Sequence, residues 1–264
     1  MKNLIRTVSA ALLALMGTAC APYLFDSIET EEVFRQNVSV SPADHKVSSL
    51  EYTYEIKASD KTPAPSPDLL VLRMKRGGLL SAEYSGKNIK PFTLLYNNGN
   101  VRRYHPDTKT DDDVQNDPRM AAGLRFFYDA NFHGFAFVAR HITLRSPRTV
   151  SRNGVPCYVF DIEPKPEYLL KNAALFMDAR KRIFVGLEYK TDDEIPISCD
   201  YPKVEIIDGI AVPKIINGSV LNGTFKLVLT KFRMNVEMDD SLFNPPVQSA
   251  PAAENAAGTP PDEK

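Results

Sequence analysis

Several features are scarce or absent in this chain, and each absence narrows what the protein can be. There is no tryptophan, only 13 of the 264 residues are glycine, and no repeat runs through the sequence, which excludes collagen-like and other fibrous proteins. Lys and Arg number 32 against 33 Asp and Glu, so no basic excess exists to neutralise phosphates, and no nucleic-acid partner is expected. Hydrophobic residues make up 43%, which excludes both wholesale disorder and a polytopic membrane protein.

Motifs for catalysis and metal binding are also missing. The sequence contains no G-x-S-x-G turn, no P-loop glycine pattern and no HExxH, HxH or Cys/His ligand spacing. The acidic run at Asp111–Asp113 lacks the alternating ligands and glycine of a calcium loop, so we interpret it as part of a solvated loop. We therefore expect no metal, no cofactor and no enzymatic activity. A Ser/His/Asp triad that converges only in space would leave no local motif, so a hydrolase stays as an alternative.

Residues 1–19 have the pattern of a secretory signal peptide. Lys2 and Arg6 give it a positive start, and nine apolar or small residues follow, from Val8 to Met16. Nine residues are too few to cross a bilayer, which needs about 20. Two interpretations of its end are open. In one the general signal peptidase cuts and Cys20 is incidental, and in the other Cys20 becomes the lipid-bearing first residue of a lipoprotein.

The residues around Cys20 favour the lipoprotein signal. Gly17-Thr18-Ala19-Cys20 resembles a lipobox at its last three positions and departs from it at Gly17, where Leu is usual. Removal of residues 1–19 leaves 30 basic against 33 acidic residues, a mildly acidic mature chain. Ala21 rather than Asp after the cysteine favours delivery to the outer membrane. We expect an exported, periplasmic protein that is anchored to the outer membrane through Cys20 and touches the membrane only there.

Two further cysteines, Cys157 and Cys199, remain as an even pair in an oxidising compartment. A disulfide between them would contribute roughly 3–4 kcal/mol on the chain-entropy model. The alternative is two buried free thiols, because cysteine is among the most buried residue types.

Alternation of apolar and polar residues predicts a mainly β fold. The clearest stretch is 50–56, where Leu50, Tyr52, Tyr54 and Ile56 alternate with polar neighbours. Turn signals recur between such stretches, at Asn98-Gly99, Asn153-Gly154, Asp208-Gly209, Asn217-Gly218 and Asn222-Gly223. We predict a curled antiparallel sheet of about 10–11 strands that forms a half-open β-barrel, with two or three short helices as a lid, because a long twisted sheet curls or closes.

Helical signals are few. A short helix is predicted at Thr30–Asn37, and a longer one begins at Asp117-Pro118, where a capping residue precedes proline. A third is predicted at Pro166–Ala173. The domain organisation is then a tether with a short helix at 20–45, one domain at 46–244 and a disordered Pro/Ala-rich tail at 245–264.

The stretch from Phe126 to Phe137 is unusually aromatic, with six of its twelve residues Phe or Tyr. One helical face would bury Phe127 and Tyr128 and leave Phe126 on another side. Large aromatics on more than one face suit an apolar ligand, although they equally suit a helix packed on a sheet as ordinary core. The candidate cavity and lid residues are Leu124, Phe126, Phe127, Phe132, Phe135 and Phe137.

The order of several motifs resembles a known superfamily. Asn153-Gly154-Val155-Pro156-Cys157-Tyr158 leads into a strand that ends at Pro164, Asp208-Gly209-Ile210-Ala211-Val212-Pro213 comes next, and Phe232–Phe243 closes the domain. An earlier hairpin, at Asn98-Gly99, is followed by Tyr104-His105-Pro106. In this order the motifs are similar to those of the LolA/LolB-like superfamily, especially its outer-membrane lipoprotein-sorting proteins. The resemblance runs from about 50 to 246.

This resemblance implies a half-closed antiparallel barrel with a concave apolar face and helices as a lid. Such proteins bind acyl chains of lipoproteins, or other lipids, without covalent chemistry. The soluble carrier of the family is not lipidated and its outer-membrane acceptor is, so an acylated Cys20 would make this chain resemble the acceptor. The implied partners are acyl chains of lipoproteins or phospholipids and a lipoprotein-releasing inner-membrane complex. The alternative function is an envelope-stress sensor or scaffold that resembles MucB and RseB, shares the fold and binds a protein partner.

Overall fold

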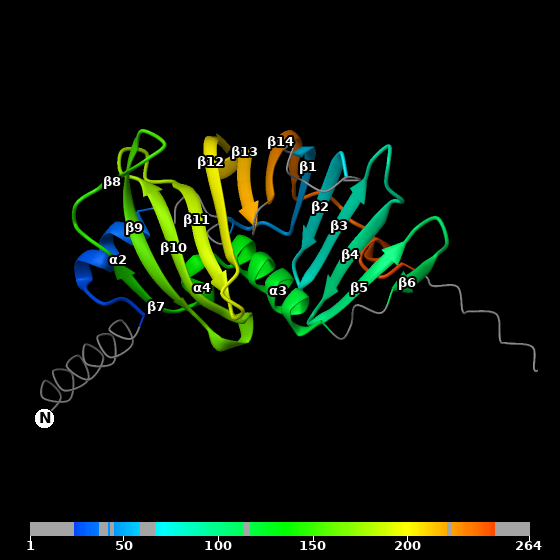
Figure 1. The fold of residues 1–264 in the computed structure, drawn as a ribbon, viewed down its shortest axis with the longest axis horizontal. Coiled ribbons are helices and arrows are strands. Elements are labelled where there is room, and N and C mark those ends of the chain that lie inside the picture. The colour runs from blue at the N-terminus through cyan, green and yellow to red at the C-terminus, as the bar shows by residue number, and fades with distance from the viewer. Residues whose placement is uncertain are drawn as a thin grey trace, which may run out of the picture.

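The computed structural model describes residues 24–36, 42, 45–58, 67–112, 117–220 and 223–245. In these residues 14 strands form one antiparallel sheet, which is curled and does not close (Figure 1). The predicted fold class is therefore confirmed, with more strands than the 10–11 expected. The predicted signal peptide, Cys20 and the tail from Pro246 lie outside the described residues.

The strands divide into two wings that meet where β1 pairs with β14. The N-terminal wing comprises β1 (Ser49–Ala58), β2 (Leu69–Lys75), β3 (Leu79–Ser85), β4 (Phe92–Asn97), β5 (Asn100–His105) and β6 (Thr110–Asp112). The C-terminal wing comprises β7 (Ala139–Leu144), β8 (Val150–Arg152), β9 (Val155–Pro164), β10 (Leu170–Asp178), β11 (Phe184–Thr191), β12 (Pro196–Ile207), β13 (Ile210–Val220) and β14 (Gly223–Met234).

The path of the chain explains where its main helix lies. From β1 the chain builds the N-terminal wing outward to β6 at one edge of the sheet, and it returns from β7 at the other edge to β14 beside β1. The segment between the two edge strands holds α3 (Pro118–Phe132) and α4 (Phe135–Val138). This segment must cross the sheet, and Figure 1 shows α3 lying across the concave side between the wings.

Three of the predicted hairpin turns have the backbone conformation that their sequence predicts. Asn98-Gly99, Asn153-Gly154 and Asp208-Gly209 all have positive φ at both residues, as tight hairpin turns require. Asn217-Gly218 was predicted as a turn, and this is wrong: Gly218 lies inside β13, paired with Phe225. The ring of Phe225 comes within 2.0 Å of where a Cβ on Gly218 would lie, so the glycine makes room for the ring.

Two of the three helices predicted from the sequence are present in the structure. The structure has α2 at Ile28–Arg35, capped by Ser27, and α3 starts at Pro118 with Asp117 as its cap. The helix predicted at Pro166–Ala173 is wrong: a single 3₁₀ turn, η3 (Pro166–Tyr168), leads directly into β10. A second 3₁₀ turn, η4 (Asp240–Leu242), follows β14. Strand pairing decides the case of β10, because Leu170 and Ala173 lie opposite Thr191 and Tyr189 of β11.

Two hydrophobic clusters pack against the sheet, the first on the N-terminal wing together with β13 and β14, and the second on β7 and β9–β11. The first contains Leu50 and Met74 of the N-terminal wing, and the second contains Phe160 and Leu175 of the C-terminal wing. α3 contributes to both, with Tyr128 and Phe132 in the first and Phe126 in the second. The helix therefore connects two cores that the open sheet would otherwise keep apart.

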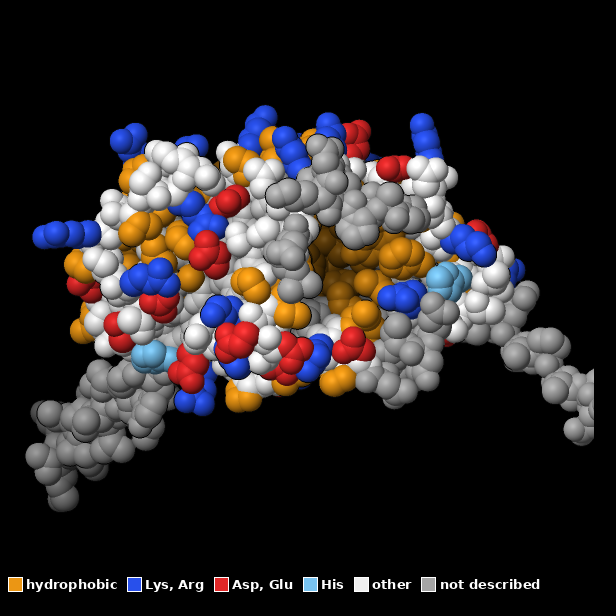
Figure 2. Space-filling view, viewed as in Figure 1, with side chains coloured by type: hydrophobic (Ala, Val, Ile, Leu, Met, Phe, Trp, Pro, Cys, Tyr) orange, Lys and Arg blue, Asp and Glu red, His pale blue; other side chains and the backbone are white. Residues whose placement is uncertain are grey.

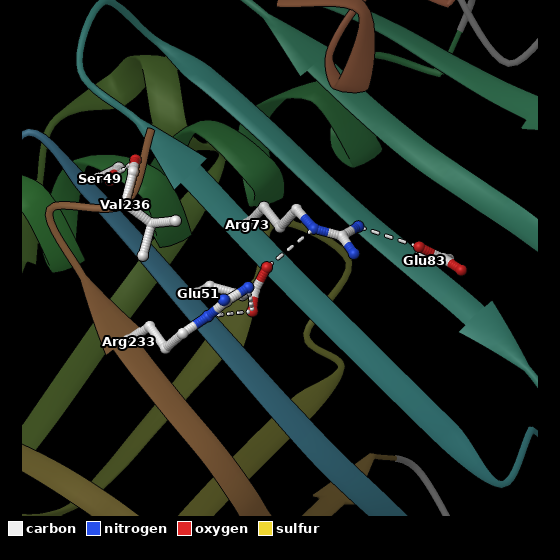
Figure 3. A network of polar contacts seen from close by, with 6 residues as sticks. All are labelled: Ser49, Glu51, Arg73, Glu83, Arg233 and Val236. Carbon is white, nitrogen blue, oxygen red and sulfur yellow. Dashed lines mark hydrogen bonds and ion pairs between the residues drawn. The ribbon is translucent and has the colours of Figure 1, made fainter. Parts of the chain in front are cut away.

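A charged network on the opposite face of β1 joins the strands where the wings meet (Figure 3). Glu51 lies directly across from Arg73 of β2 and Arg233 of β14. Its carboxylate accepts hydrogen bonds from Arg73 Nε at 3.2 Å and from Arg233 at 2.6 Å, while Arg73 also donates to Glu83 at 2.9 Å. Burial by itself raises the pKa of Glu51, but the hydrogen bonds and charges of the two arginines outweigh it and hold the pKa below the ordinary 4.5.

We expect Glu51→Gln to lower the free energy of unfolding at pH 7 by about 1–3 kcal/mol, because it removes the charge from a buried acceptor of two guanidinium groups. A carboxyl group whose pKa is lowered by folding stabilises the protein at pH values above its pKa in the unfolded chain. This stabilisation is lost as the pH falls through the pKa of the group in the folded protein. The difference from wild type in urea unfolding should therefore shrink below pH 4.5. Glu83→Gln, at the exposed end of the network, is the control and should cost less; a loss that is equal in both variants and independent of pH would contradict this role for Glu51.

Candidate functional site

A cavity of about 550 Å³ lies between α3, α4 and the concave face of the sheet. Figure 2 shows hydrophobic side chains gathered in a hollow on this face of the molecule. The volume is in the range of pockets that bury small molecules. The apolar side chains around it include Leu70, Leu72, Leu80, Tyr84, Phe184, Leu187, Val204, Pro213, Ile216 and Leu227.

The pleat of the strands makes this lining apolar. On β1 every second side chain faces inward, so Tyr52 and Tyr54 line the cavity while Glu51 forms ion pairs on the other face. β2 repeats the pattern, with Leu70 and Leu72 in the lining. The alternation that predicts the strands therefore also predicts which of their residues reach the cavity.

The candidate residues of the aromatic stretch fall into two groups. Leu124, Phe126, Phe127 and Phe135 line the cavity, and Phe132 and Phe137 do not. Phe132 is fully buried in the cluster under the N-terminal wing, where it stacks on Tyr128 at 4.9 Å between ring centroids. The side chain of Phe137 is exposed, in contact with the His133 ring and the Lys165 ammonium group.

Within α3 the sequence pattern misplaces two neighbours. The prediction that Phe127 is buried and Phe126 lies on a different side is wrong: Phe126 is 6% exposed and Phe127 is 40% exposed. Phe126 packs on the rings of Tyr168 and Tyr189, which the pattern of α3 alone cannot reveal. α3 has protein on two sides, so a single apolar stripe does not describe it.

Hydrogen bonds fasten α3 to both wings. The Tyr128 hydroxyl donates to the carbonyl of Lys75 and accepts from the amide of Gly78, both at 3.0 Å, at the β2–β3 turn. On the other side the Tyr168 hydroxyl donates to the buried carboxylate of Asp129 at 2.9 Å. These bonds hold α3 as a fixed wall of the cavity.

The cavity has little charge. Arg35 is the one Asp, Glu, Lys or Arg among the described residues that line it, and its guanidinium pairs with Glu31 at 2.8 Å. The lining also contains Asn131, His133 and four tyrosines, Tyr52, Tyr54, Tyr84 and Tyr201. All four tyrosines lie outside the aromatic stretch. The alternation along 50–56 and along β3 signals the first three, while nothing in the pattern around Tyr201 does so.

Of the two alternatives for Cys157 and Cys199, a disulfide or two free thiols, the structure has the free thiols. Cys157 lies on β9 and Cys199 on β12, with β10 and β11 between them. Three strand spacings amount to roughly 14 Å, while a disulfide needs Cα atoms within about 7 Å. Burial raises the pKa of both thiols, that of Cys199 to about 11.

Among the residues that the structure describes, no group of three or more His, Cys, Asp or Glu side chains is placed to hold a metal ion. None of the helices in those same residues has the length and apolar character that a membrane span requires.

No protein-family model and no curated protein matches the chain. Solved structures do match its fold. A LolA superfamily protein from Nitrosomonas europaea is 12% identical with a TM-score of 0.56, over 81% of this chain and 96% of that one. A domain assigned as an outer membrane lipoprotein-sorting protein, from Vibrio parahaemolyticus, is 11% identical with a TM-score of 0.52. The match covers 81% of this chain and 94% of that one.

A DUF1329 family protein from Desulfovibrio piger is similar to the same degree, with 13% identity and a TM-score of 0.51 over 81% of this chain and 96% of that one. At these identities the similarity is one of fold. The chain shares its fold with a LolA superfamily protein, as the order of the motifs in the sequence predicted.

We expect Tyr168→Phe to lower the free energy of unfolding by about 1–3 kcal/mol, because the buried Asp129 carboxylate loses its hydroxyl donor and its ion pair with Arg125 is longer, at 3.6 Å. Urea unfolding measures this loss. The control repeats Tyr168→Phe in an Asp129→Asn background, where the loss should be smaller. An equal loss in both backgrounds would show that the hydroxyl does not stabilise α3 through Asp129.

Proposed function

We propose that this protein is a non-enzymatic carrier or acceptor that binds acyl chains in the cavity between α3 and the curled sheet. The observation that carries the proposal is the cavity itself, about 550 Å³ lined mainly by hydrocarbon and aromatic side chains. It lies in a fold shared with an outer membrane lipoprotein-sorting domain, which supports the same function here.

The energetics favour such a ligand. Each buried methylene contributes about 0.8 kcal/mol, so roughly ten give about 8 kcal/mol, which corresponds to micromolar binding before ordering costs. An acyl chain also suits a lining with one charged residue, because the chain brings no charge that needs a buried partner.

The setting of this activity belongs to the same proposal. We place the protein in the periplasm, attached to the outer membrane through an acylated Cys20, where it would receive lipoproteins or phospholipids. An inner-membrane lipoprotein-releasing complex would load the carrier that delivers them. The support for this setting is the signal-like pattern of residues 1–19 followed by Cys20.

The direct test is native mass spectrometry of the chain from Ala21 onward, which keeps every described residue, purified from a bacterial periplasm without detergent. We expect extra mass that disappears on organic extraction and matches a phospholipid or an acylated peptide. A chain that is free of lipid, and stays so when lipid is added, would contradict the proposal and favour a sensor or scaffold that binds a protein.

A matched pair of variants tests the position of the site. Phe127→Asp places a charge on the cavity wall at an exposed position, so it should weaken binding of a fluorescent fatty acid at least tenfold without unfolding the protein. Phe137→Asp is the control, because Phe137 is similarly exposed and lies outside the cavity lining. Equal binding by the two variants would mean that the acyl chain binds elsewhere.

The anchor has its own test. Protein expressed with its natural signal and extracted from outer membranes should have the mass of the chain from Cys20 plus a diacylglyceryl group and an N-acyl chain. A chain that begins after Cys20, or an unmodified Cys20, would show that the general signal peptidase cuts and that this protein has no lipid anchor.

A further inference from the structure

Four tyrosines line the cavity, and one of them, Tyr54, lies within electrostatic reach of two others, Tyr52 and Tyr201. The hydroxyls of Tyr128 and Tyr168 have protein partners, at Lys75 and Asp129. The structure gives the hydroxyls of Tyr52, Tyr54 and Tyr201 no hydrogen bond to another described residue, and all three side chains line the cavity. A hydroxyl at the wall of an apolar cavity takes its acceptor from what fills the cavity, water or ligand, because a hydroxyl left unpaired is costly.

These three side chains belong to one region of the cavity. Tyr52 and Tyr54 project from the same face of β1, with their rings stacked at 6.0 Å between centroids, and both are at least nine-tenths buried. Tyr201 comes from β12 and lines the same cavity. Burial raises the pKa of all three, and the proximity of Tyr52 and Tyr201 raises that of Tyr54 further, so the hydroxyls stay protonated and able to donate at neutral pH.

We propose that the hydroxyls of Tyr52, Tyr54 and Tyr201 form a donor site for the ester carbonyls of an acylated glycerol, so that the cavity selects acyl esters over plain hydrocarbon. This inference rests on the proposed function and names the class of lipid that the same site takes. It gives each hydroxyl an acceptor inside an otherwise apolar cavity.

The charge around the site favours a neutral acceptor over an anion. Arg35, the one charged residue among the described residues of the lining, is paired with Glu31, and 61% of its side chain is exposed to solvent. A phosphate or carboxylate beside the three hydroxyls would lose its hydration without gaining a cation, which is expensive. An ester carbonyl accepts hydrogen bonds at a much smaller desolvation cost.

The same hydroxyls penalise a ligand that has no acceptor. In an unliganded cavity water can accept from them, and a carbonyl that displaces this water keeps the hydrogen bonds. A saturated chain that displaces it leaves the hydroxyls without partners. A site built in this way discriminates against the analogue that lacks the polar group.

The test compares an ester with its ether analogue, using the chain from Ala21 onward and two probes, 1-oleoylglycerol and 1-O-oleylglycerol. Wild type should bind the ester roughly tenfold more tightly in calorimetric titration. The double variant Tyr54→Phe/Tyr201→Phe should bind both probes alike, because its affinity for the ether rises once the ether leaves no hydroxyl without a partner. Tyr158→Phe on β9 is the matched control, because it removes a hydroxyl outside the cavity lining and should keep the ester preference.

The outcomes separate this inference from the proposed function. Binding of neither probe by wild type would overturn both. Equal binding of ester and ether by wild type, or an ester preference that survives in the double variant, would overturn the tyrosine site and leave acyl-chain binding intact. The unliganded double variant should also be at least as stable as wild type, and a clear loss of stability would show that the hydroxyls bond to protein.

A competition experiment distinguishes the sources of the ester. Bound 1-oleoylglycerol is titrated with a triacylated lipopeptide or with dioleoyl phosphatidylglycerol. Displacement by the lipopeptide alone assigns the site to lipoproteins, displacement by the phospholipid alone assigns it to membrane lipid, and displacement by both assigns it to their shared ester groups. Displacement by neither would overturn the assignment to acylated glycerol.

Discussion

The connection between the two edge strands is the constraint on which the rest of the structure depends. Because β6 and β7 lie at opposite edges of the sheet, the segment between them has to cross the concave face, and it does so as α3. A helix of 15 residues is about 22 Å long and about 10 Å wide. Thirteen strands lie side by side in the sheet, so its concave face is on the order of 60 Å across. α3 therefore covers only part of this face, and the cavity is lined by the apolar surface that remains.

The manner in which α3 is held bears on how a ligand enters. Tyr128 fastens it to the β2–β3 turn of the N-terminal wing, and Asp129 fastens it to Tyr168 of the C-terminal wing. Its buried side chains belong to both hydrophobic clusters. The role of a lid, which the sequence suggested for the helices, therefore fits α3 poorly, because lifting it would open two cores at once. One residue of α3, Phe127, is exposed and also lines the cavity.

Most of the fold could be predicted because its signals are local. The alternation at Leu50–Ile56, the paired positive-φ residues at Asn98-Gly99 and the cap at Asp117 each act within a few residues. Predictions failed where a distant partner decides. β10 is a strand because it pairs with β9 on one side and β11 on the other. Gly218 lies in a strand because the Phe225 ring occupies the space of a side chain there.

The sequence by itself determined the class of structure, the inward face of β1 and β2, and the concentration of aromatics that forms one wall of the cavity. The tertiary structure decided which of Phe126 and Phe127 reaches solvent, kept Cys157 and Cys199 apart, and brought Tyr201 of β12 into the cavity with Tyr54 of β1. The physical reason is that alternation assigns a side chain to a face of the sheet within one strand, whereas the curl of 14 strands decides which side chains on that face share a space.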